Sequence, residues 1–403
     1  MNYLNIENFI AESITKRKNS LFLSDLSEYK DVLLNKIKNK TVLVIGGAGT
    51  IGSAFTKEIL NFLPSKIVIV DTNENALTEL TRDLRSTKNQ FIPKDYTTYP
   101  MSFYDSSFYN MFRKNKGFNI IANFAAHKHV RSEKDIYSIQ AMLNNNVFQA
   151  NVFLNLLVEY KPENFFCVST DKAAKPVNVM GASKKLMEEV IMSYKDLFNV
   201  TTARFANVAF SNGSLLDGYI NRVTKKQPVS CPDNVKRFFV SPKESGQICL
   251  LACMLGKSGE VFFPKLSLKD LVSFKKITIS FFKKLGLNVH KCDSEKDAKN
   301  FIINFNKKKD YPVYFFKSDT SGEKLYEEFY SEKDIIDSSS FNSLGIIKKQ
   351  KFLTLNESKS IIDNLKDVVN KTGCSKKDII KCMSNIIDDF IHQEKGKNLD
   401  QKM

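Results

Sequence analysis

From residue 41 onward, short apolar runs alternate with longer stretches in which apolar residues recur at helical spacing. The runs of strand length cover residues 42–45, 67–70, 119–124, 165–169 and 201–205. Helical spacing covers residues 51–62, 136–160 and 179–198. Continuous apolar runs are typical of strands buried on both faces, and their alternation with helices indicates a parallel sheet. The pattern therefore predicts an α/β fold with a Rossmann-type, doubly wound parallel sheet.

The regions outside this alternation predict a division into four parts. Residues 1–40 form an N-terminal helical extension, and residues 41–210 form the nucleotide-binding domain. Residues 211–335, punctuated by prolines, form a smaller substrate-binding region that is interleaved with the core. Residues 336–403 form a C-terminal helical extension, with helices expected at 356–370 and 375–393.

The chain carries a formal net charge of +16, from 60 Lys and Arg against 44 Asp and Glu. The lysines are spread along the sequence, and no helix-turn-helix, aromatic RNA-binding or zinc-finger pattern accompanies them. We therefore predict a solvated basic surface and no nucleic-acid partner. Such a surface also attracts an anionic small molecule.

Composition excludes several other classes. No apolar stretch has the length of about 20 residues that a membrane helix needs. The N-terminal residues carry no apolar segment typical of a secretory signal. The seven cysteines form no CxxC pair and the four histidines have no zinc spacing, so we expect reduced thiols and no metal. The sequence predicts a cytoplasmic protein without membrane insertion.

A glycine-rich turn after the first apolar run is the first candidate for chemistry. It reads Gly46-Gly-Ala-Gly49-Thr50-Ile51-Gly52. Glycines suit a tight turn that lets backbone approach a pyrophosphate, whose charge the next helix N-terminus stabilises. The spacing is GxxGxxG rather than GxGxxG, and the alternative is a purely structural turn.

Asp71 strengthens the nucleotide interpretation of this turn. It ends the next apolar run, about twenty residues beyond Gly52, where an acidic side chain accepts hydrogen bonds from ribose hydroxyls. A carboxylate there also repels a 2′-phosphate. The glycine turn and Asp71 together predict a dinucleotide site that prefers NAD to NADP.

Residues 167–184 hold the second candidate. Thr170, Asp171 and Lys172 follow the end of an apolar run, where open α/β sheets bind their ligands, and they offer a hydroxyl, a carboxyl and an amine. Met180 and Lys184 are four residues apart near the start of a predicted helix, so they share a face. The alternative is a polar loop with a solvent-exposed lysine.

Together these motifs resemble the extended short-chain dehydrogenases/reductases, and more closely the nucleotide-sugar 4,6-dehydratases of bacterial polysaccharide biosynthesis. The resemblance covers about residues 25–335. It rests on seven motifs in order, which are GGAGTIG (46–52), Asp71-x-x-Glu74, AAHKHV (125–130), STDKAAKPVNVMGASK (169–184), ARFANV (203–208), KRFFVSP (236–242) and GEKLYEEF (322–329).

The resemblance implies a reaction and a role for each residue of the second candidate. NAD oxidises C4 of the sugar, water is eliminated across C5 and C6, and hydride returns to C6. Lys172 would be the base at C5 and Asp171 the acid at the C6 hydroxyl. Thr170 would hydrogen-bond the C4 oxygen, and Lys184 would hold the nicotinamide ribose.

Met180 departs from the tyrosine of many members. A thioether cannot accept the C4 hydroxyl proton, so Asp171, Thr170 or water would relay it. A methionine here is similar to the subgroup acting on UDP-N-acetylglucosamine, whose larger members carry membrane helices. This chain would be a free-standing version of them.

The resemblance also implies further binding residues. Cofactor contacts would come from Gly46, Gly49, Thr50, Ile51, Gly52, Asp71, Glu74, Ala125, Ala126, Asn146 and Lys184. The nucleotide sugar would be held by His127, Lys128, His129, Asn207, Arg237 and Glu323.

Several positions depart from the family pattern. Ala206 replaces a glycine, and Ser102 stands where an aspartate usually binds adenine. Thr320 and Ser321 replace an Arg-Pro pair near the substrate. Ser102 therefore bears on the adenine contacts, and Thr320 and Ser321 bear on which nucleobase or sugar the protein prefers.

Three functions remain open from the sequence. The first is an NAD-dependent UDP-N-acetylglucosamine 4,6-dehydratase. The second is a nucleotide-sugar 4-epimerase, against which the Asp171–Lys172 pair argues. The third is a catalytically silent nucleotide-binding sensor or scaffold, which Met180 favours. The resemblance further implies a homo-oligomer.

Overall fold

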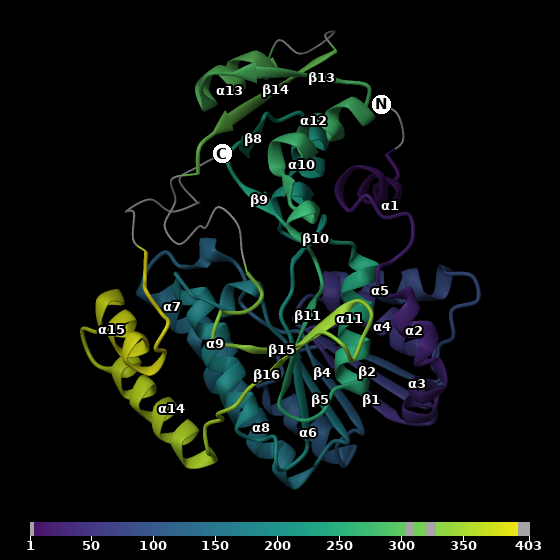
Figure 1. Cartoon of the computed structure of the whole chain (residues 1–403), viewed down its shortest axis with the longest axis vertical. Helices are drawn as coiled ribbons and strands as arrows, with labels where there is room; N and C mark the ends of the chain where they lie inside the picture. The colour runs from purple at the N-terminus through teal and green to yellow at the C-terminus, as the bar shows by residue number, and fades with distance from the viewer. Residues whose placement is uncertain (1–3, 304–308, 319–327, 394–403) are drawn as a thin grey trace.

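A nine-stranded sheet forms the centre of the larger of two parts (Figure 1). The computed structural model describes residues 4–303, 309–318 and 328–393. The strand order is β15-β16-β11-β6-β5-β4-β1-β2-β3. The strands are β1 (Thr41–Ile45), β2 (Lys66–Asp71), β3 (Asp95–Pro100), β4 (Ile120–Asn123), β5 (Asn164–Val168), β6 (Asn199–Ala203), β11 (Glu260–Pro264), β15 (Ile335–Asp337) and β16 (Leu344–Lys348). Neighbours from β3 to β11 are parallel, whereas β16 is antiparallel to both β11 and β15.

Helices pack on both faces of this sheet, which confirms the predicted doubly wound α/β fold. Helices α4 and α11 lie on one face and α8 and α9 on the other (Figure 1). These and the other helices of this part are α4 (Thr50–Leu60), α5 (Glu74–Ser86), α6 (Ser106–Lys114), α7 (Ile136–Leu143), α8 (Gln149–Glu159), α9 (Val179–Met192) and α11 (Pro242–Leu255). Helices α4 and α11 cross closely at Gly246, where a Cβ would lie 2.5 Å from the carbonyl of Ala54.

The smaller part has its own core and its own parallel sheet, of order β13-β14-β8. Its elements are α10 (Leu215–Thr224), β8 (Val229–Pro232), α12 (Phe274–Lys284), β13 (Asn288–Cys292), α13 (Glu295–Ile303) and β14 (Asp310–Phe316). Two short pairs lie between the parts, β7 (Asn207–Val208) with β10 (Phe239–Val240) and β9 (Lys236–Arg237) with β12 (Val272–Ser273).

The N-terminal extension belongs to both cores. Its elements are α1 (Ile6–Phe9), a π-helix (Ile10–Ile14), α2 (Leu23–Glu28) and α3 (Lys30–Ile37). Phe9 and Ile14 are buried in the smaller core, whereas Phe22 and Leu33 are buried in the main core. The helices are shorter than the uniform helical extension we predicted, since the segment crosses from one part to the other.

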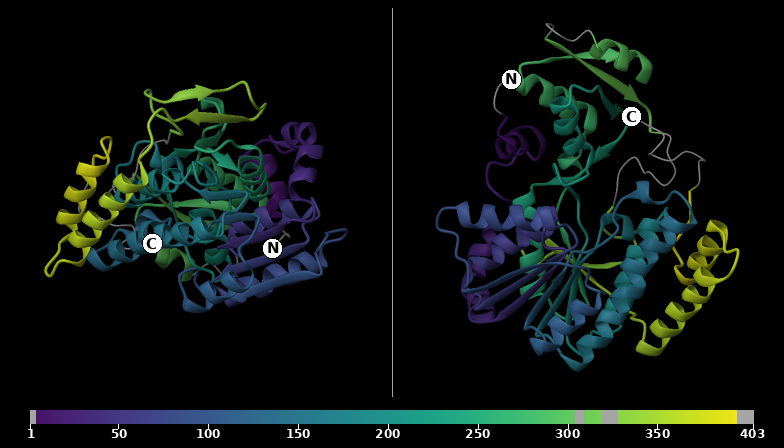
Figure 2. Two further views of the ribbon diagram at one scale, coloured as in Figure 1. Left: turned by 90° about the horizontal axis from the view of Figure 1, so that it is seen from below. Right: turned by 180° about the vertical axis from the view of Figure 1, so that it is seen from behind.

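The C-terminal region differs at its start from the predicted helical extension. Strand β16 returns to the central sheet, and only then do α14 (Leu355–Asn370) and α15 (Lys376–Ile386) follow. Helix α14 matches the prediction, but α15 ends seven residues before position 393 and the chain continues as an irregular segment. Both helices lie beside α8 and α9 (Figure 2).

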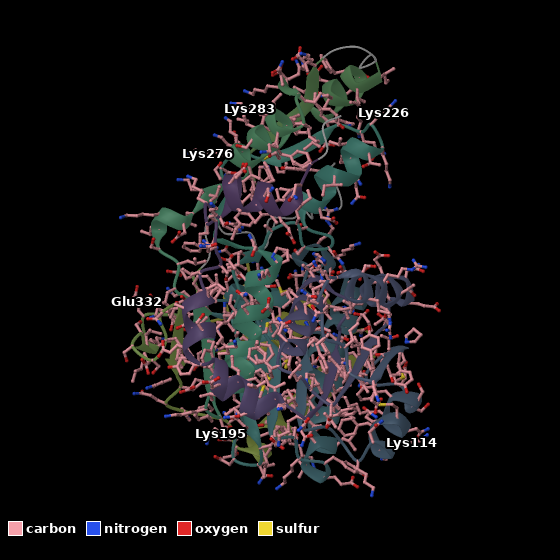
Figure 3. All side chains as sticks on the ribbon, turned by 90° about the vertical axis from the view of Figure 1, so that its right-hand side faces the viewer. Lys114, Lys195, Lys226, Lys276, Lys283 and Glu332 are labelled. Carbon is pink, nitrogen blue, oxygen red and sulfur yellow. The ribbon has the colours of Figure 1, made fainter. Side chains whose placement is uncertain are left out.

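Lysine side chains lie on the periphery of both parts. Lys114, Lys195, Lys226, Lys276 and Lys283 all extend outward from the ribbon (Figure 3). Their distribution over separate elements agrees with a solvated basic surface rather than with one binding face.

Candidate active site

The glycine turn joins β1 to α4 and has no room for side chains at two positions. Gly46 has a φ of +70°, and a Cβ there would lie 2.5 Å from the amide nitrogen of Ala125. A Cβ at Gly52 would lie 2.3 Å from the carbonyl oxygen of Gly46. Gly49 is the N-cap of α4, so Thr50 and Ile51 form its first turn. The turn thus presents bare backbone at a helix N-terminus, as a pyrophosphate site requires.

Asp71 at the end of β2 is joined directly to this turn. Its Oδ2 accepts a hydrogen bond from the amide of Ala48 at 3.0 Å, and its Oδ1 accepts one from Asn73 at 3.0 Å. The carboxylate is therefore held beside the glycine backbone, where the sequence places a ribose partner. Glu74 lies exposed in the first turn of α5.

The loop after β4 is anchored by the buried side chain of Asn146. Its Oδ1 accepts from the amide of His127 at 2.9 Å, and its Nδ2 donates to the carbonyl of His127 at 3.0 Å. Asn146 lies in a single π-turn (Asn144–Phe148) between α7 and α8, and such turns are frequent at functional sites. These contacts set the loop in which Ala125 and Ala126 lie. A direct contact of Asn146 with a cofactor stays a prediction.

His127, Lys128 and His129 follow in this loop with exposed side chains. Protein nevertheless surrounds them sufficiently that burial lowers the pKa of all three, with Asp217 opposing the shift at Lys128. The ring of His129 lies against Gly213 of the smaller part, whose Cβ would be 3.2 Å from Nε2. The three side chains of this loop are therefore exposed to solvent, although neighbouring protein atoms partly surround them.

Thr170, Asp171 and Lys172 form one hydrogen-bonded group directly after β5. Asp171 is 4% exposed, and its Oδ1 accepts from Thr170 Oγ1 at 2.9 Å and from Lys172 Nζ at 3.1 Å. The amide of Asp171 donates to the carbonyl of Phe205 after β6 at 3.2 Å. The structure thus joins the predicted acid and base in one ion pair at the carboxyl end of the sheet.

Met180 and Lys184 lie on α9, which follows this group in the chain, and both side chains are buried. Met180 is 1% exposed and packs in the main core. Lys184 Nζ donates to the carbonyl of Val168 at 2.6 Å and lies 3.2 Å from Met187 Sδ. Burial lowers the pKa of Lys184. A ribose contact of Lys184 stays a prediction, since protein atoms meet its ammonium here.

A buried ion pair adjoins the site and was not predicted. Arg204 forms two hydrogen bonds with Glu188, of 3.0 and 2.8 Å, and Glu188 also accepts from Ser169 Oγ at 2.5 Å. Burial is the largest single influence and raises the pKa of Glu188, but the charge and hydrogen bonds of Arg204, together with Lys185 and Ser169, outweigh it and lower the pKa to about 2. Arg204 lies in the ARFANV motif, but only the fold shows that its partner is Glu188.

Asn207 and Arg237 lie in the short strands between the two parts. Asn207 is in β7, and its amide donates to the carbonyl of Phe238 at 3.0 Å. Arg237 is in β9 and is 5% exposed. Glu323 lies outside the described residues.

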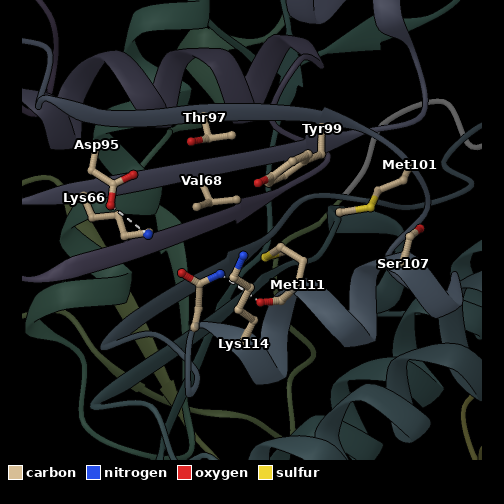
Figure 4. Close-up of a pocket in the computed structure, with 10 residues that line it drawn as sticks. Lys66, Val68, Asp95, Thr97, Tyr99, Met101, Ser107, Met111 and Lys114 are labelled. Atoms are coloured by element: carbon tan, nitrogen blue, oxygen red, sulfur yellow. Dashed lines mark hydrogen bonds and ion pairs between the residues drawn. The ribbon is translucent and has the colours of Figure 1, made fainter.

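A pocket lies elsewhere, in a groove between α6 and strands β2 and β3 (Figure 4). It has a volume of about 400 Å³, and an ion pair of 2.7 Å between Lys66 and Asp95 lies at one end. None of the predicted site residues lines it.

Among the residues that the structure describes, no group of three or more histidine, cysteine or acidic side chains is arranged to hold a metal ion. None of the helices that the structure describes is long and apolar enough to cross a membrane.

The chain is similar in sequence to several known proteins. An uncharacterized membrane protein of Methanocaldococcus jannaschii is 30% identical over 356 residues, which are 85% of this chain and 96% of that protein. The capsular polysaccharide biosynthesis protein CapD of Staphylococcus aureus is 28% identical over 75% of this chain, which spans 47% of the relative's length. A UDP-glucose 4-epimerase of Rickettsia canadensis is 27% identical over 56% of this chain and 66% of its own.

Two solved structures have a similar fold. The protein Pen from Bacillus thuringiensis matches 81% of this chain and 98% of its own, with a TM-score of 0.62 and 19% identity. The dTDP-glucose 4,6-dehydratase DesIV from Streptomyces venezuelae, solved with NAD, matches 72% of this chain and 88% of its own, with a TM-score of 0.54 and 18% identity.

The doubly wound sheet with a glycine turn after β1 is thus a fold that the chain shares with Pen and with the 4,6-dehydratase DesIV. More narrowly, the chain belongs to the family described as "Polysaccharide biosynthesis protein", whose sequence model matches residues 42–349.

Proposed function

We propose that this protein is an NAD-dependent 4,6-dehydratase that converts UDP-N-acetylglucosamine to a 4-keto-6-deoxy product in surface polysaccharide biosynthesis. The observation that carries the proposal is the ion pair at the carboxyl end of β5 between the buried Asp171 carboxylate and the partly buried Lys172. An elimination across C5 and C6 needs an acid and a base side by side, whereas a 4-epimerase needs neither at these carbons.

The glycine turn and Asp71 fit NAD. Because Gly46 and Gly52 lack a Cβ, the turn closes tightly against neighbouring backbone and presents the N-terminus of α4 to a pyrophosphate, and the Asp71 carboxylate suits ribose hydroxyls. NAD, when bound, supplies hydride acceptance at C4 and hydride return at C6. The chain's own residues provide the proton chemistry and the orientation.

The elimination requires Lys172 as a neutral amine and Asp171 as a carboxylic acid, and their side chains are 3.1 Å apart. In the proposed sequence, Lys172 first releases its ammonium proton to solvent, and Asp171 becomes an acid by taking up the C4 hydroxyl proton. The amine can then take the C5 proton while the acid protonates the departing C6 hydroxyl, which leaves as water. The C5 proton returns from Lys172 when hydride is added at C6.

The C4 hydroxyl proton requires a different acceptor from the usual tyrosine. Met180 is buried and lacks an acidic or basic atom. Thr170 donates to Asp171 at 2.9 Å, which makes a path from the substrate hydroxyl through Thr170 to the carboxylate. We propose this path as the relay, with Asp171 as its end.

Product analysis of substituted proteins tests the proposal. Purified protein is incubated with UDP-N-acetylglucosamine, and the 4-keto-6-deoxy product is followed by mass loss of one water. Lys172→Ala and Asp171→Asn should each lower kcat by about 10²–10⁴-fold, the usual contribution of a general acid or base. Lys175→Ala is the matched control, because this nearby lysine pairs with Glu328 instead.

The second candidate is a nucleotide-sugar 4-epimerase, favoured by the epimerases among the relatives. The same incubation distinguishes the two, because an epimer has the mass of its substrate. An epimer formed at an unchanged rate by Asp171→Asn would support this second candidate. Bound NAD without any product would instead support the silent sensor.

A further inference from the structure

The C-terminal segment contacts the loop that leads into the candidate catalytic helix. The amide of Gln393 donates to the carbonyl of Val177 at 3.0 Å, and the amide of Ile391 to the carbonyl of Pro176 at 3.4 Å. This loop connects the Asp171–Lys172 turn to α9. A segment beyond the part matched by the family model therefore lies directly beside the candidate site.

Glu133 joins the same segment to the first turn of α9. Its carboxylate is 5% exposed, and Oε2 accepts a hydrogen bond of 2.6 Å from the amide of Val179. Its Oε1 lies 2.5 Å from His392 Nε2 and 3.3 Å from Lys376 Nζ. A carboxylate only accepts, so Nε2 carries the proton. The C-terminal region thus supplies two partners for the side chain that holds the helix start.

The C-terminal segment is firmly packed, which allows it to support a loop. Ile387 and Phe390 are buried in the main core after α15. A hydrogen bond of 2.9 Å from Gln140 Nε2 to the carbonyl of Val369 joins helix α7 of the main part to α14. Figure 2 shows both C-terminal helices along the side of α8 and α9.

The first turn of α9 in turn fixes the position of Lys172. Asn178 caps the helix, accepting from the amide of Gly181 at 2.7 Å. A Cβ at Gly181 would lie 2.7 Å from the carbonyl oxygen of Lys172, so the helix packs against this backbone without a gap. A displacement of the helix start therefore displaces the Lys172 backbone as well.

We propose that Glu133 and His392 are positioning residues for the candidate site. His392 holds the Glu133 carboxylate, Glu133 holds the amide of Val179, and the first turn of α9 holds the backbone of Lys172. The C-terminal extension then helps to position the candidate catalytic residues. Only the kinetic part of this inference rests on the proposed function.

The test combines backbone hydrogen exchange with kinetics on the full chain. The variants are His392→Ala, His392→Gln, whose amide can still donate to Glu133, and Glu133→Gln. His290→Ala is the matched control, because His290 stacks on Phe301 in the smaller part. Exchange is measured by mass spectrometry on peptides spanning residues 172–183, with peptides from β1 and β2 as internal references.

His392→Ala and Glu133→Gln should each speed exchange in residues 172–183 by about tenfold to a hundredfold, as expected for loss of a hydrogen bond to a charged group. The β1 and β2 peptides and His290→Ala should match the unsubstituted protein, and His392→Gln should recover most of the protection. In the kinetic arm, kcat should fall by about tenfold or more with little change in KM, because a small misplacement of a reacting group lowers the rate.

Unchanged exchange in residues 172–183 of His392→Ala would overturn the inference, as would acceleration spread evenly over the chain. If the unsubstituted protein turns over no nucleotide sugar, the proposed function fails. The exchange comparison still decides whether these residues hold the loop.

Discussion

Removing Arg204 should leave Glu188 as an uncompensated charge in the interior. Arg204→Met keeps the apolar stem but removes both hydrogen bonds to Glu188 and the one to the carbonyl of Phe329. Breaking a buried ion pair on one side costs about 3–5 kcal/mol. The pKa of Glu188, lowered from 4.5 to about 2, points in the same direction, because it shows that the folded protein stabilises the charged carboxylate.

The pH dependence of this contribution follows from the direction of the shift. The pKa of Glu188 is lower in the folded protein than in the unfolded chain, so the stabilisation is fully present above about pH 4.5. It is lost as the pH falls towards about 2, where the folded-state carboxylate takes up a proton. The unsubstituted protein should therefore lose stability in this window.

Thermal and denaturant unfolding of three variants provide the assay. With an unfolding entropy of about 2.1 cal/mol/K per residue, 3–5 kcal/mol lowers the Tm of a chain of this length by about 4–6 °C. Glu188→Gln combined with Arg204→Met should recover most of this loss, because no unpaired charge remains. A cost below about 1 kcal/mol for Arg204→Met alone would refute the reasoning. So would an equal pH dependence between about 2 and 4.5 in the double variant, which lacks the titrating carboxyl group.

Three further outcomes follow from the nucleotide site and the loop after β4. Gly52→Ala should abolish NAD binding in equilibrium dialysis, because its Cβ would lie 2.3 Å from the carbonyl of Gly46, and binding within about twofold of normal would contradict the assigned turn. Asp71→Asn should weaken NAD binding by about tenfold and reduce the ratio of the affinity for NAD to the affinity for NADP. An unchanged affinity ratio would exclude a contact of Asp71 with the ribose. Asn146→Ala should lower the Tm by about 2–4 °C, since it leaves the backbone amide and carbonyl of His127 without their partners, and no change in Tm would contradict that anchoring role.

The sequence predicted five buried apolar strands of the main sheet but missed β11, which is equally buried and lies in the region that we assigned to substrate binding. The runs at 42–45, 67–70 and 165–169 correspond to β1, β2 and β5 with shifts of one or two residues. Strand β3 was missed because it is the edge of the sheet and its residues are half-buried or exposed, so no continuous apolar run marks it. Strand β16 was missed because it lies in a region that we interpreted as helical.

The candidate site was predictable where local sequence decides it. The glycine turn and the Thr170–Asp171–Lys172 group depend on neighbours in the chain, and the motifs identified them. The contact between Glu133 and His392 joins residues 259 positions apart, and no local pattern contains it. The burial of Lys184 against the carbonyl of Val168 likewise follows from packing between α9 and β5.

The central claim is that Lys172 and Asp171 eliminate water across C5 and C6. The most direct measurement is NMR of the product formed from UDP-N-acetylglucosamine in deuterated water. The account predicts a 4-keto-6-deoxy sugar that carries solvent deuterium at C5, with product formation lost in Lys172→Ala and retained in Lys175→Ala. A product without deuterium at C5, or a 4-epimer that retains its C6 hydroxyl, would contradict it.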